Sequence, residues 1–438
     1  MATGRDAALD ALTACRRLDA WSDGSLKAVS RGLEPREAAL AARLAYGVLQ
    51  NRALLDYYLG CFCAQPFQKL EPFVRDVLRL GAYQVLFMDR VPDSAAVDQA
   101  VETVKRRKHQ RASGMVNAVL RRLSREKDHL PALPEGTAQE RLSLQYSHPA
   151  WLTGRLLDLL GPEEAEAFLR LDNGSVPTAI QRNPLRCTPE ELTASLEAAG
   201  ARLTPHPLLP DCWYMTGGGD VQAMEAFQKG FFQVQDPAAK AAVLAAGPRP
   251  GDRVLDVCAA PGGKTFAAAM AMEDKGEIVA CDIHPHKMAL IEKGAARLGL
   301  TCVSAVRADG KINREEWNER FDLVLCDVPC SGLGIIRKKP DIRYKDPAAL
   351  SGLPAVQRAI LDNAARYVKP GGTLLYATCT VLPEENGAVT EGFLSEHPGL
   401  EKAPFVLTGL GLETDGSVTL WPQRQGTDGF YICKMRKL

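Results

Sequence analysis

Two cysteines each follow a run of hydrophobic residues that is typical of a buried strand. Cys330 lies in CDVPCSGLG (residues 326–334), and Cys379 lies in YATCTV (residues 376–381). The two positions are 49 residues apart, so no single loop or helix holds both, and only the fold could bring the thiols together. A thiolate is a nucleophile, so such a pair could form a covalent bond to a substrate and later break it. The alternative is that both are inert cysteines that pack at strand ends.

A second candidate site is RVLDVCAAPGGKT (residues 253–265), which predicts a strand, a turn of small residues and the start of a helix. In an open α/β sheet, ligands bind at the carboxyl ends of the strands, beside the turn after the first strand. Small residues let a ligand approach the backbone, and a helix amino terminus offers free N–H donors. The next predicted strand ends at Asp282, where an acid can accept hydrogen bonds from ribose hydroxyls. The alternative is a turn whose small residues serve packing alone.

Basic residues gather in two parts of the chain, although 53 Lys and Arg balance 53 Asp and Glu overall. Between residues 101 and 127, nine basic side chains stand against two acidic ones, and the group includes Arg106, Arg107 and Lys108. The second group follows Cys330 directly, in GLGIIRKKPDIRYK, and its members are Arg337, Lys338, Lys339, Arg343 and Lys345. Clusters of this kind can hold the phosphates of a nucleic acid, or they can be solvated surfaces.

The elements that must position these residues fall into three segments with different patterns. Apolar residues recur at helical spacing over residues 1–130, which predicts an all-α domain, and a proline-containing linker follows. Short apolar runs around a helical pattern predict a small α+β domain over 140–230. From 231 to 438, five short apolar strands alternate with helices, which predicts an α/β Rossmann-like domain with a largely parallel sheet and a terminal hairpin.

Length and composition limit the possible classes of protein. A chain of 438 residues is long enough for about three domains, and 46% hydrophobic against 24% charged residues is typical of a globular protein. No stretch approaches the roughly 20 apolar residues of a membrane span, and the first residues lack a secretory pattern, so we expect a cytoplasmic protein without a membrane partner. The twelve cysteines include no CxxC pair or Cys/His ligand set, so we expect reduced thiols and no metal site.

Taken together, CAAPGGK (residues 258–264), DVPCSGLG and YATCT closely resemble the motifs of the Sun/RsmB family of S-adenosylmethionine-dependent RNA cytosine carbon-5 methyltransferases. The resemblance covers most of the chain. LAYGVL, LRLGAYQVLF and VNAVLRR resemble the family's NusB-like helical RNA-binding domain, and FFQVQDPAA resembles the lead-in to its catalytic domain. One difference is that the family usually has Thr-Cys-Ser where this chain has Thr378-Cys379-Thr380, although a threonine hydroxyl can make the same hydrogen bond.

The resemblance implies a class I methyltransferase fold with S-adenosylmethionine as its cofactor. It implies that Asp282 binds the ribose, that Asp309 faces the adenine, and that Asp327 lies between cofactor and base, where it could hydrogen-bond a cytosine. Asp309 could instead cap the helix that follows it. The cofactor-binding residues that the resemblance implies are Cys258, Ala259, Ala260, Pro261, Gly262, Gly263, Lys264, Asp282, Asp309 and Asp327.

The two thiols fit this chemistry because carbon 5 of cytosine is a poor nucleophile until a thiolate adds to carbon 6. Sequence chemistry alone does not rank them. DNA cytosine methyltransferases attack with a Pro-Cys cysteine, which would favour Cys330. The resembled RNA family attacks with the Thr-Cys cysteine, so we expect Cys379 to be the nucleophile, Cys330 to help release the product, and Asp327 to take part in catalysis.

The NusB-like segment implies 16S ribosomal RNA as the substrate, bound through Arg106, Arg107, Lys108, Arg337, Lys338, Lys339 and Arg343. A base must leave its stack to reach the thiols, which favours RNA loops or single strands. The alternatives are a tRNA methyltransferase with the same chemistry, or a non-catalytic RNA-binding or transcription adaptor, against which the intact cysteine and cofactor motifs argue. We expect a monomer.

Overall fold

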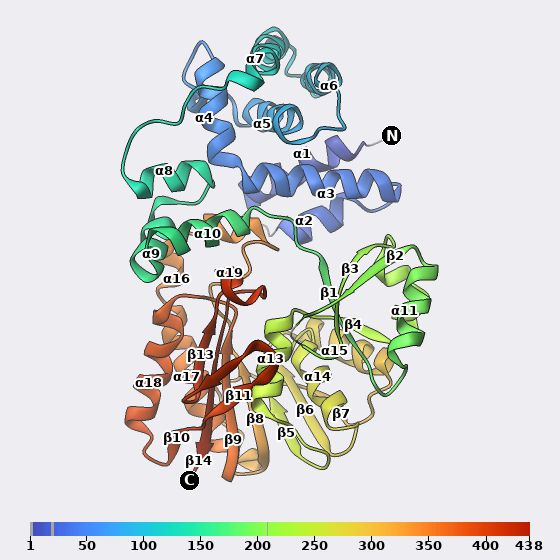
Figure 1. Ribbon diagram of the computed structural model, residues 1–438, viewed down its shortest axis with the longest axis vertical. Helices are drawn as coiled ribbons and strands as arrows, with labels where there is room; N and C mark the ends of the chain where they lie inside the picture. Colours follow the sequence, from blue (N-terminus) through green and yellow to red (C-terminus); the bar gives the residue numbers. More distant parts are fainter. Residues whose placement is uncertain (1–2, 19–21, 208) are drawn as a thin grey trace. The chain divides into compact units, whose positions relative to one another are not determined.

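The computed structural model describes residues 3–18, 22–207 and 209–438 (Figure 1). The chain divides into two compact units, each of which is described by itself. We call Met1–Ser175 together with Ile336–Lys345 the helical unit, and Val176–Ile335 together with Asp346–Leu438 the sheet unit. Within the described ranges, no helix is long and apolar enough to cross a membrane.

The helical unit confirms the helical spacing of the first segment. Its main helices are α1 (Gly4–Leu18), α2 (Ser22–Val29), α3 (Pro35–Gln50), α4 (Arg52–Phe62), α5 (Pro72–Phe87), α6 (Asp93–Arg106), α7 (Ser113–Glu126), α8 (Ala138–Gln145), α9 (Ala150–Leu160) and α10 (Pro162–Asp172). Helix α5 is the most buried of the first seven, and it packs against α1, α3, α4, α6 and α7. Glycine permits a close approach of α3 to α5, because a Cβ added at Gly47 of α3 would clash with the Tyr83 ring of α5.

A short piece of the chain after Cys330 also packs in the helical unit. It contains the 3₁₀ helix η6 (Pro340–Tyr344), which lies against α3. The sequence pattern placed these residues inside one continuous catalytic domain over 231–438. In the structure the chain instead leaves the sheet unit after Ile335, contributes ten residues to the helical unit, and returns at Asp346.

The sheet unit begins with a small antiparallel sheet in the order β2-β3-β1-β4. Its strands are β1 (Thr178–Arg182), β2 (Ala201–Pro205), β3 (Cys212–Gly217) and β4 (Phe232–Val234), with helices α11 (Pro189–Ala198) and α12 (Glu225–Gln228). This is the α+β arrangement expected from the short apolar runs. The helices α8–α10, which the pattern grouped with it, belong to the helical unit.

The large sheet has the order β10-β14-β9-β8-β5-β6-β7, with β13 paired to β14. Its strands are β5 (Arg253–Asp256), β6 (Glu277–Asp282), β7 (Val303–Arg307), β8 (Phe321–Asp327), β9 (Val368–Thr378), β10 (Leu400–Lys402), β13 (Ser417–Leu420) and β14 (Phe430–Lys437). Strands β5 to β9 pair in parallel with one another, and β14 is antiparallel to β9, β10 and β13. The strand order reverses at β5, so the turn after β5 lies at the switch point where such sheets bind ligands.

Both faces of the large sheet are covered, as the alternation of its side chains requires. Val254, Leu323 and Leu375 contribute to the core with α13 (Pro237–Ala246), α14 (Gly263–Ala271) and α15 (Pro285–Leu298). Their chain neighbours Leu255 and Val324 contribute to the opposite core with α17 (Leu353–Tyr367) and α18 (Gly387–Glu396). Figure 1 shows these two helix layers on either side of the sheet. Three short elements complete the unit: α16 (Pro347–Leu350), α19 (Pro422–Gln425) and the hairpin β11 (Phe405–Leu407) with β12 (Leu412–Thr414).

Candidate active site

The predicted site residues of the sheet unit gather at the carboxyl ends of its parallel strands. Asp282 ends β6, Asp327 ends β8, and Cys379 directly follows β9. The register brings these ends level, since Asp327 is paired with Ala377 and Asp256 with Leu325. The fold therefore places side chains from distant parts of the sequence at one edge.

The two thiols meet at this edge. The Sγ atoms of Cys330 and Cys379 are 3.2 Å apart, which is a hydrogen-bonding contact and not a disulfide. Both residues are half-buried. The hydrogen bond to Cys379, the removal from water and the nearby charges of Cys379, Glu385 and Asp327 raise the pKa of the Cys330 thiol well above its ordinary value. Cys330 therefore retains its proton at neutral pH.

Direct hydrogen bonds tie the two cysteine loops together. The Ser331 hydroxyl donates to the Thr380 hydroxyl oxygen at 2.7 Å, and the Gly334 N–H donates to the carbonyl of Cys379 at 2.9 Å. Thr380 is fully buried and occupies the position where the resembled family has serine. The Thr380 hydroxyl accepts the hydrogen bond from Ser331, so a threonine can make the hydrogen bond expected of a serine at this position.

A buried carboxyl group that sequence reasoning missed joins the same frame. Glu385, in the 3₁₀ helix after β9, is 2% exposed. Its Oε2 accepts from the Ser331 N–H and from Nε2 of Gln357, both at 2.8 Å. Gln357 also donates to the carbonyl of Pro329 at 3.0 Å, so both chain neighbours of Cys330 are held. The only sequence signal was an acid in LPEENG soon after Cys379, and nothing in that pattern distinguishes Glu385 from Glu384.

Asn386 continues this support under the Cys379 loop. Its side-chain oxygen accepts from the Thr378 hydroxyl at 2.5 Å, and its amide donates to the carbonyl of Thr380 at 3.0 Å. Both residues that flank Cys379 are thus fixed by one buried side chain. The Cys379 loop is therefore held in place by hydrogen bonds from within the sheet unit.

Asp327 is paired with a lysine from the loop after β5. The Lys264 ammonium donates to Oδ2 of Asp327 at 2.6 Å, and Lys264 is 9% exposed. Burial acts to lower the pKa of Lys264, but the charge and hydrogen bond of Asp327 outweigh it, so the pKa is raised. A charged lysine is thus fixed next to a carboxylate at the strand edge that carries the thiols.

The turn after β5 has the close backbone packing that its small residues suggested. Gly262 has φ +110°, and a Cβ there would clash with the Phe266 ring. The Ala259 N–H donates to the carbonyl of Cys281 at 2.7 Å, which ties the turn to β6. Burial, together with the nearby charges, raises the pKa of the Cys258 thiol well above its ordinary value, so this thiol keeps its proton, and its contact with the cofactor stays a prediction.

The acids at this edge suit a cofactor with a ribose and a positive charge. Asp282 is 7% exposed; its Oδ1 accepts from the His284 N–H at 2.9 Å and its Oδ2 from Lys287 at 3.3 Å. Asp256 is buried and its Oδ1 has no partner, while burial, despite the Thr265 hydrogen bond, raises its pKa to about 7. A small-residue turn, a helix amino terminus and an acid at the end of β6 are the features that S-adenosylmethionine requires, and the residues present fit it.

Asp309 follows β7 and makes local contacts. Its Oδ1 accepts from the Lys311 N–H at 3.0 Å, and its Oδ2 lies 3.8 Å from the Lys311 ammonium. The carboxylate is partly exposed, so these bonds leave room for a further donor. These are contacts of a turn and not of a helix cap, because the next helical element, η5 (Glu315–Trp317), has Arg314 at its N-cap; the adenine contact stays a prediction.

Arg343 requires a correction. It is fully buried in the helical unit, whereas a phosphate-binding side chain must reach solvent. Three helices end around it, and their last carbonyls accept its hydrogen bonds: Gln50 of α3 at 3.1 Å, Tyr146 after α8 at 3.3 Å and Asp172 of α10 at 3.4 Å. Helix carboxyl termini carry partial negative charge, so a cation is stabilised there. The basic pattern of the segment was right, but for Arg343 it indicates a structural role.

The other predicted RNA-binding residues have different surroundings. Arg106 pairs with Asp6, and Arg107 pairs with Asp10 and more distantly with Asp6, all on α1. Lys108 is exposed, in the turn after α6. The remaining three are half-buried, and their contact with RNA stays a prediction: Arg337, Lys338 and Lys339.

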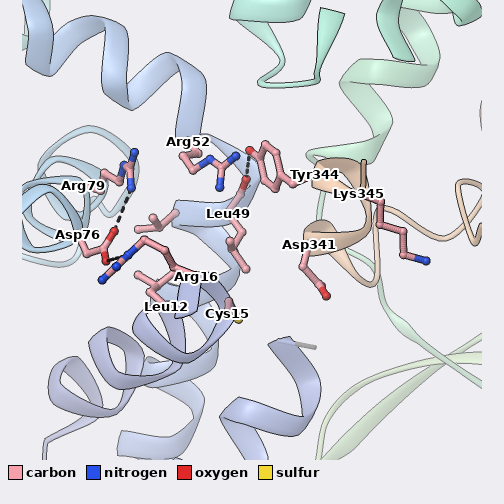
Figure 2. A pocket seen from close by; sticks show the side chains of 11 residues that line it. Leu12, Cys15, Arg16, Leu49, Arg52, Asp76, Arg79, Asp341, Tyr344 and Lys345 are labelled. Atoms are coloured by element: carbon pink, nitrogen blue, oxygen red, sulfur yellow. Dashed lines mark hydrogen bonds and ion pairs between the residues drawn. The ribbon is translucent and has the colours of Figure 1, made fainter. Parts of the chain in front are cut away.

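The helical unit also contains a cavity of about 440 Å³ that sequence reasoning did not suggest (Figure 2). On one side, Arg79 and Arg16 both pair with Asp76, at 2.9 and 3.1 Å. On the other, the Arg52 guanidinium lies 3.5 Å over the Tyr344 ring. The cavity brings residues of α1, α3 and α5 to the segment after Cys330. In the described part of the chain, no group of three or more His, Cys, Asp or Glu side chains could hold a metal ion.

Comparison with known proteins agrees with this arrangement. Residues 242–436 match the family of the 16S rRNA methyltransferase RsmB/F, residues 2–125 match the NusB family, and residues 148–222 match the ferredoxin-like domain of RsmF/B-like methyltransferases. A Bacillus subtilis (strain 168) protein named "Probable ribosomal RNA small subunit methyltransferase B" is 38% identical, covering 99% of this chain and 98% of its own. The Vibrio cholerae "Ribosomal RNA small subunit methyltransferase B" is 33% identical over 99% of this chain and 97% of its own.

A solved structure supports the fold over the whole chain. The crystal structure of PH0851 is 27% identical, with a TM-score of 0.81, and the match covers 99% of this chain and 98% of that one. The sequence relatives, the three matched regions and the cofactor edge all point to one family. The chain belongs to the RsmB/F family of methyltransferases, whose cofactor is S-adenosylmethionine.

Proposed function

We propose that this protein methylates carbon 5 of a cytosine in 16S ribosomal RNA through a covalent bond between Cys379 and carbon 6 of the base. The observation that carries the proposal is the 3.2 Å contact between the two thiols at the ends of β8 and β9, in a chain of this family. Relatives named ribosomal RNA small subunit methyltransferase B support the choice of RNA. Their names do not specify a nucleotide.

In this proposal Cys379 begins the reaction. Its sulfur adds to carbon 6, and the electron pair of the 5,6 double bond becomes available at carbon 5. S-adenosylmethionine supplies an electrophilic methyl group at this edge when bound. Carbon 5 takes the methyl as S-adenosylhomocysteine leaves, solvent water takes the proton from carbon 5, and the electron pair of the broken C–H bond expels the Cys379 thiolate from carbon 6. Atoms and charge balance, because the added sulfur departs as it arrived.

Asp327 and Lys264 suit recognition of the base. A carboxylate can accept from the exocyclic amine of cytosine, and Asp327 ends the strand that leads to Cys330. Lys264 donates to one carboxylate oxygen of Asp327, Oδ2, and we propose that the other oxygen accepts from the base. We propose that this pair orients the ring with carbon 6 toward the thiols.

Cys330 suits the second half of the reaction. Its thiol keeps its proton because the pKa is raised, and it is within hydrogen-bonding distance of the Cys379 sulfur. A neutral thiol that donates to Cys379 stabilises that sulfur as a thiolate, both before attack and on release. This supports the assignment of Cys379 as nucleophile and Cys330 as release helper.

The direct test is methyl transfer from labelled S-adenosylmethionine to RNA from cells that lack the protein, followed by mapping of the labelled nucleotide. We expect label at carbon 5 of one cytosine of 16S ribosomal RNA. Label confined to tRNA would overturn the ribosomal assignment. Label on a base other than cytosine would overturn the chemistry.

A further inference from the structure

A buried carboxylate, that of Glu385, holds the Cys330 loop. Among the ion pairs of the described residues, none joins it to an arginine or a lysine. Glu385 is 2% exposed, and its contacts through Oε2 are two N–H groups, from Ser331 and Gln357. Its second oxygen, Oε1, is also buried and has no hydrogen-bond partner. A buried carboxylate oxygen without a hydrogen-bond partner lowers the stability of the fold, so the presence of a glutamate at this position calls for an explanation.

The bonds of Glu385 converge on Cys330. Oε2 holds the N–H of the residue after the cysteine, and Gln357 links the same oxygen to the carbonyl of the residue before it. The backbone carbonyl of Glu385 accepts from the Tyr376 hydroxyl at 2.6 Å, which anchors the turn to β9. The carboxyl group is thereby fixed relative to both strands that deliver the thiols.

We propose that Glu385 is a positioning residue that fixes the Cys330 loop beside Cys379 and, through its negative charge, holds Cys330 as the neutral thiol. The role in catalysis rests on the proposed function, but the effect on Cys330 does not. The two cysteines follow similar strand ends, and the Glu385 carboxylate accepts a hydrogen bond from the loop of one of them, at Ser331. Its negative charge opposes ionisation of Cys330.

The charges around Cys330 are consistent with this role. The groups that act on it are Cys379, Glu385 and Asp327, and all of them oppose its ionisation. The cation at this edge, Lys264, is bonded to Asp327 and reduces the influence of that carboxylate. Tyr376 faces Cys330 from β9, and burial, with the nearby charge of Glu385, raises the pKa of its hydroxyl as well, so it stays a neutral phenol. Glu385 is thus an anion near Cys330 with no cation bonded to it.

The test is the pH dependence of Cys330 alkylation by iodoacetamide in the full-length protein, followed by peptide mass spectrometry and normalised to the exposed Cys61. Glu385→Gln keeps an acceptor for Ser331 and Gln357 but removes the charge. We expect the midpoint for Cys330 to move to lower pH by about one unit, the usual effect of one nearby charge. Glu385→Asp keeps the charge, and we expect its midpoint to stay within a few tenths of a unit of the unmodified protein.

The matched control is Glu384→Gln, which removes the same charge one residue away from an exposed position. We expect no shift there. An unchanged Cys330 midpoint in folded Glu385→Gln protein, with an unchanged thermal transition, would overturn the proposal. The assay uses neither RNA nor S-adenosylmethionine, so a failure of the proposed methylation would leave this result standing, and the reverse also holds.

Discussion

Two buried charged side chains, Glu385 in the sheet unit and Arg343 in the helical unit, hold two parts of one stretch of chain. Glu385 accepts from the N–H of Ser331, next to a cysteine. Arg343 donates to carbonyls at the ends of three helices. The first charge stands where it can change the reactivity of a neighbour. The second satisfies carbonyls, so the comparison separates a charge that tunes chemistry from a charge that stabilises structure.

The largest effect should come from the cysteines on the Glu385 side. We expect Cys379→Ala to abolish methylation and to leave no covalent RNA adduct. We expect Cys330→Ala to form the carbon 6 bond and transfer the methyl, then stall before release, so that the protein carries RNA on a denaturing gel. If the shifted band appeared with Cys379→Ala instead, the two roles would be exchanged. Unimpaired transfer by both variants would exclude covalent catalysis by these thiols.

The thiol pair could be predicted from sequence because each cysteine lies just beyond the end of a strand, and parallel strands end at one edge of a sheet. The turn after β5 and Asp282 were predictable for the same reason. Glu385 was not, because its role depends on the side-chain packing of η7 (Pro383–Glu385) against α17, and no local pattern shows which of two adjacent acids turns inward. Recognition of these positions required the folded structure.

Arg343 shows a second limit of prediction from sequence. Its neighbours in the sequence are basic, and composition alone suggested phosphate contacts. Its partners are backbone carbonyls at Gln50, Tyr146 and Asp172, which come from helices that lie far away in the chain. A backbone carbonyl has no signature in a sequence, so the burial of this arginine could not be foreseen.

The second prediction removes the charge on the Arg343 side. Arg343→Met keeps the aliphatic length but leaves several buried carbonyls without a donor, and we expect the protein to lose roughly 3 kcal/mol of stability. Hydrogen–deuterium exchange should rise most around the ends of α8 and α10. Cys330 alkylation should keep its pH midpoint, in contrast to Glu385→Gln. The control, Arg36→Met, removes an exposed arginine of the same unit and should change neither quantity.

The smallest effect should come from the cations that remain near the surface. Replacing Arg106, Arg107 and Lys108 by alanine should weaken RNA binding and flatten its dependence on salt, because fewer phosphate counterions are then released. Arg106 and Arg107 are already paired with Asp6 and Asp10. We therefore expect the magnitude of the slope of log K against log salt to fall by about one to two. Three unpaired cations would lower it by roughly 2.7.

The control for this prediction is the triple alanine variant of three exposed cations elsewhere in the helical unit, Lys27, Arg31 and Arg36. Both variants lose the same formal charge, so a general electrostatic effect would change their slopes equally. A larger change in the first variant would locate an RNA contact at the end of α6. Equal slopes would mean that the residues after α6 are an ordinary solvated surface, and that the basic cluster, like Arg343, was misinterpreted from composition.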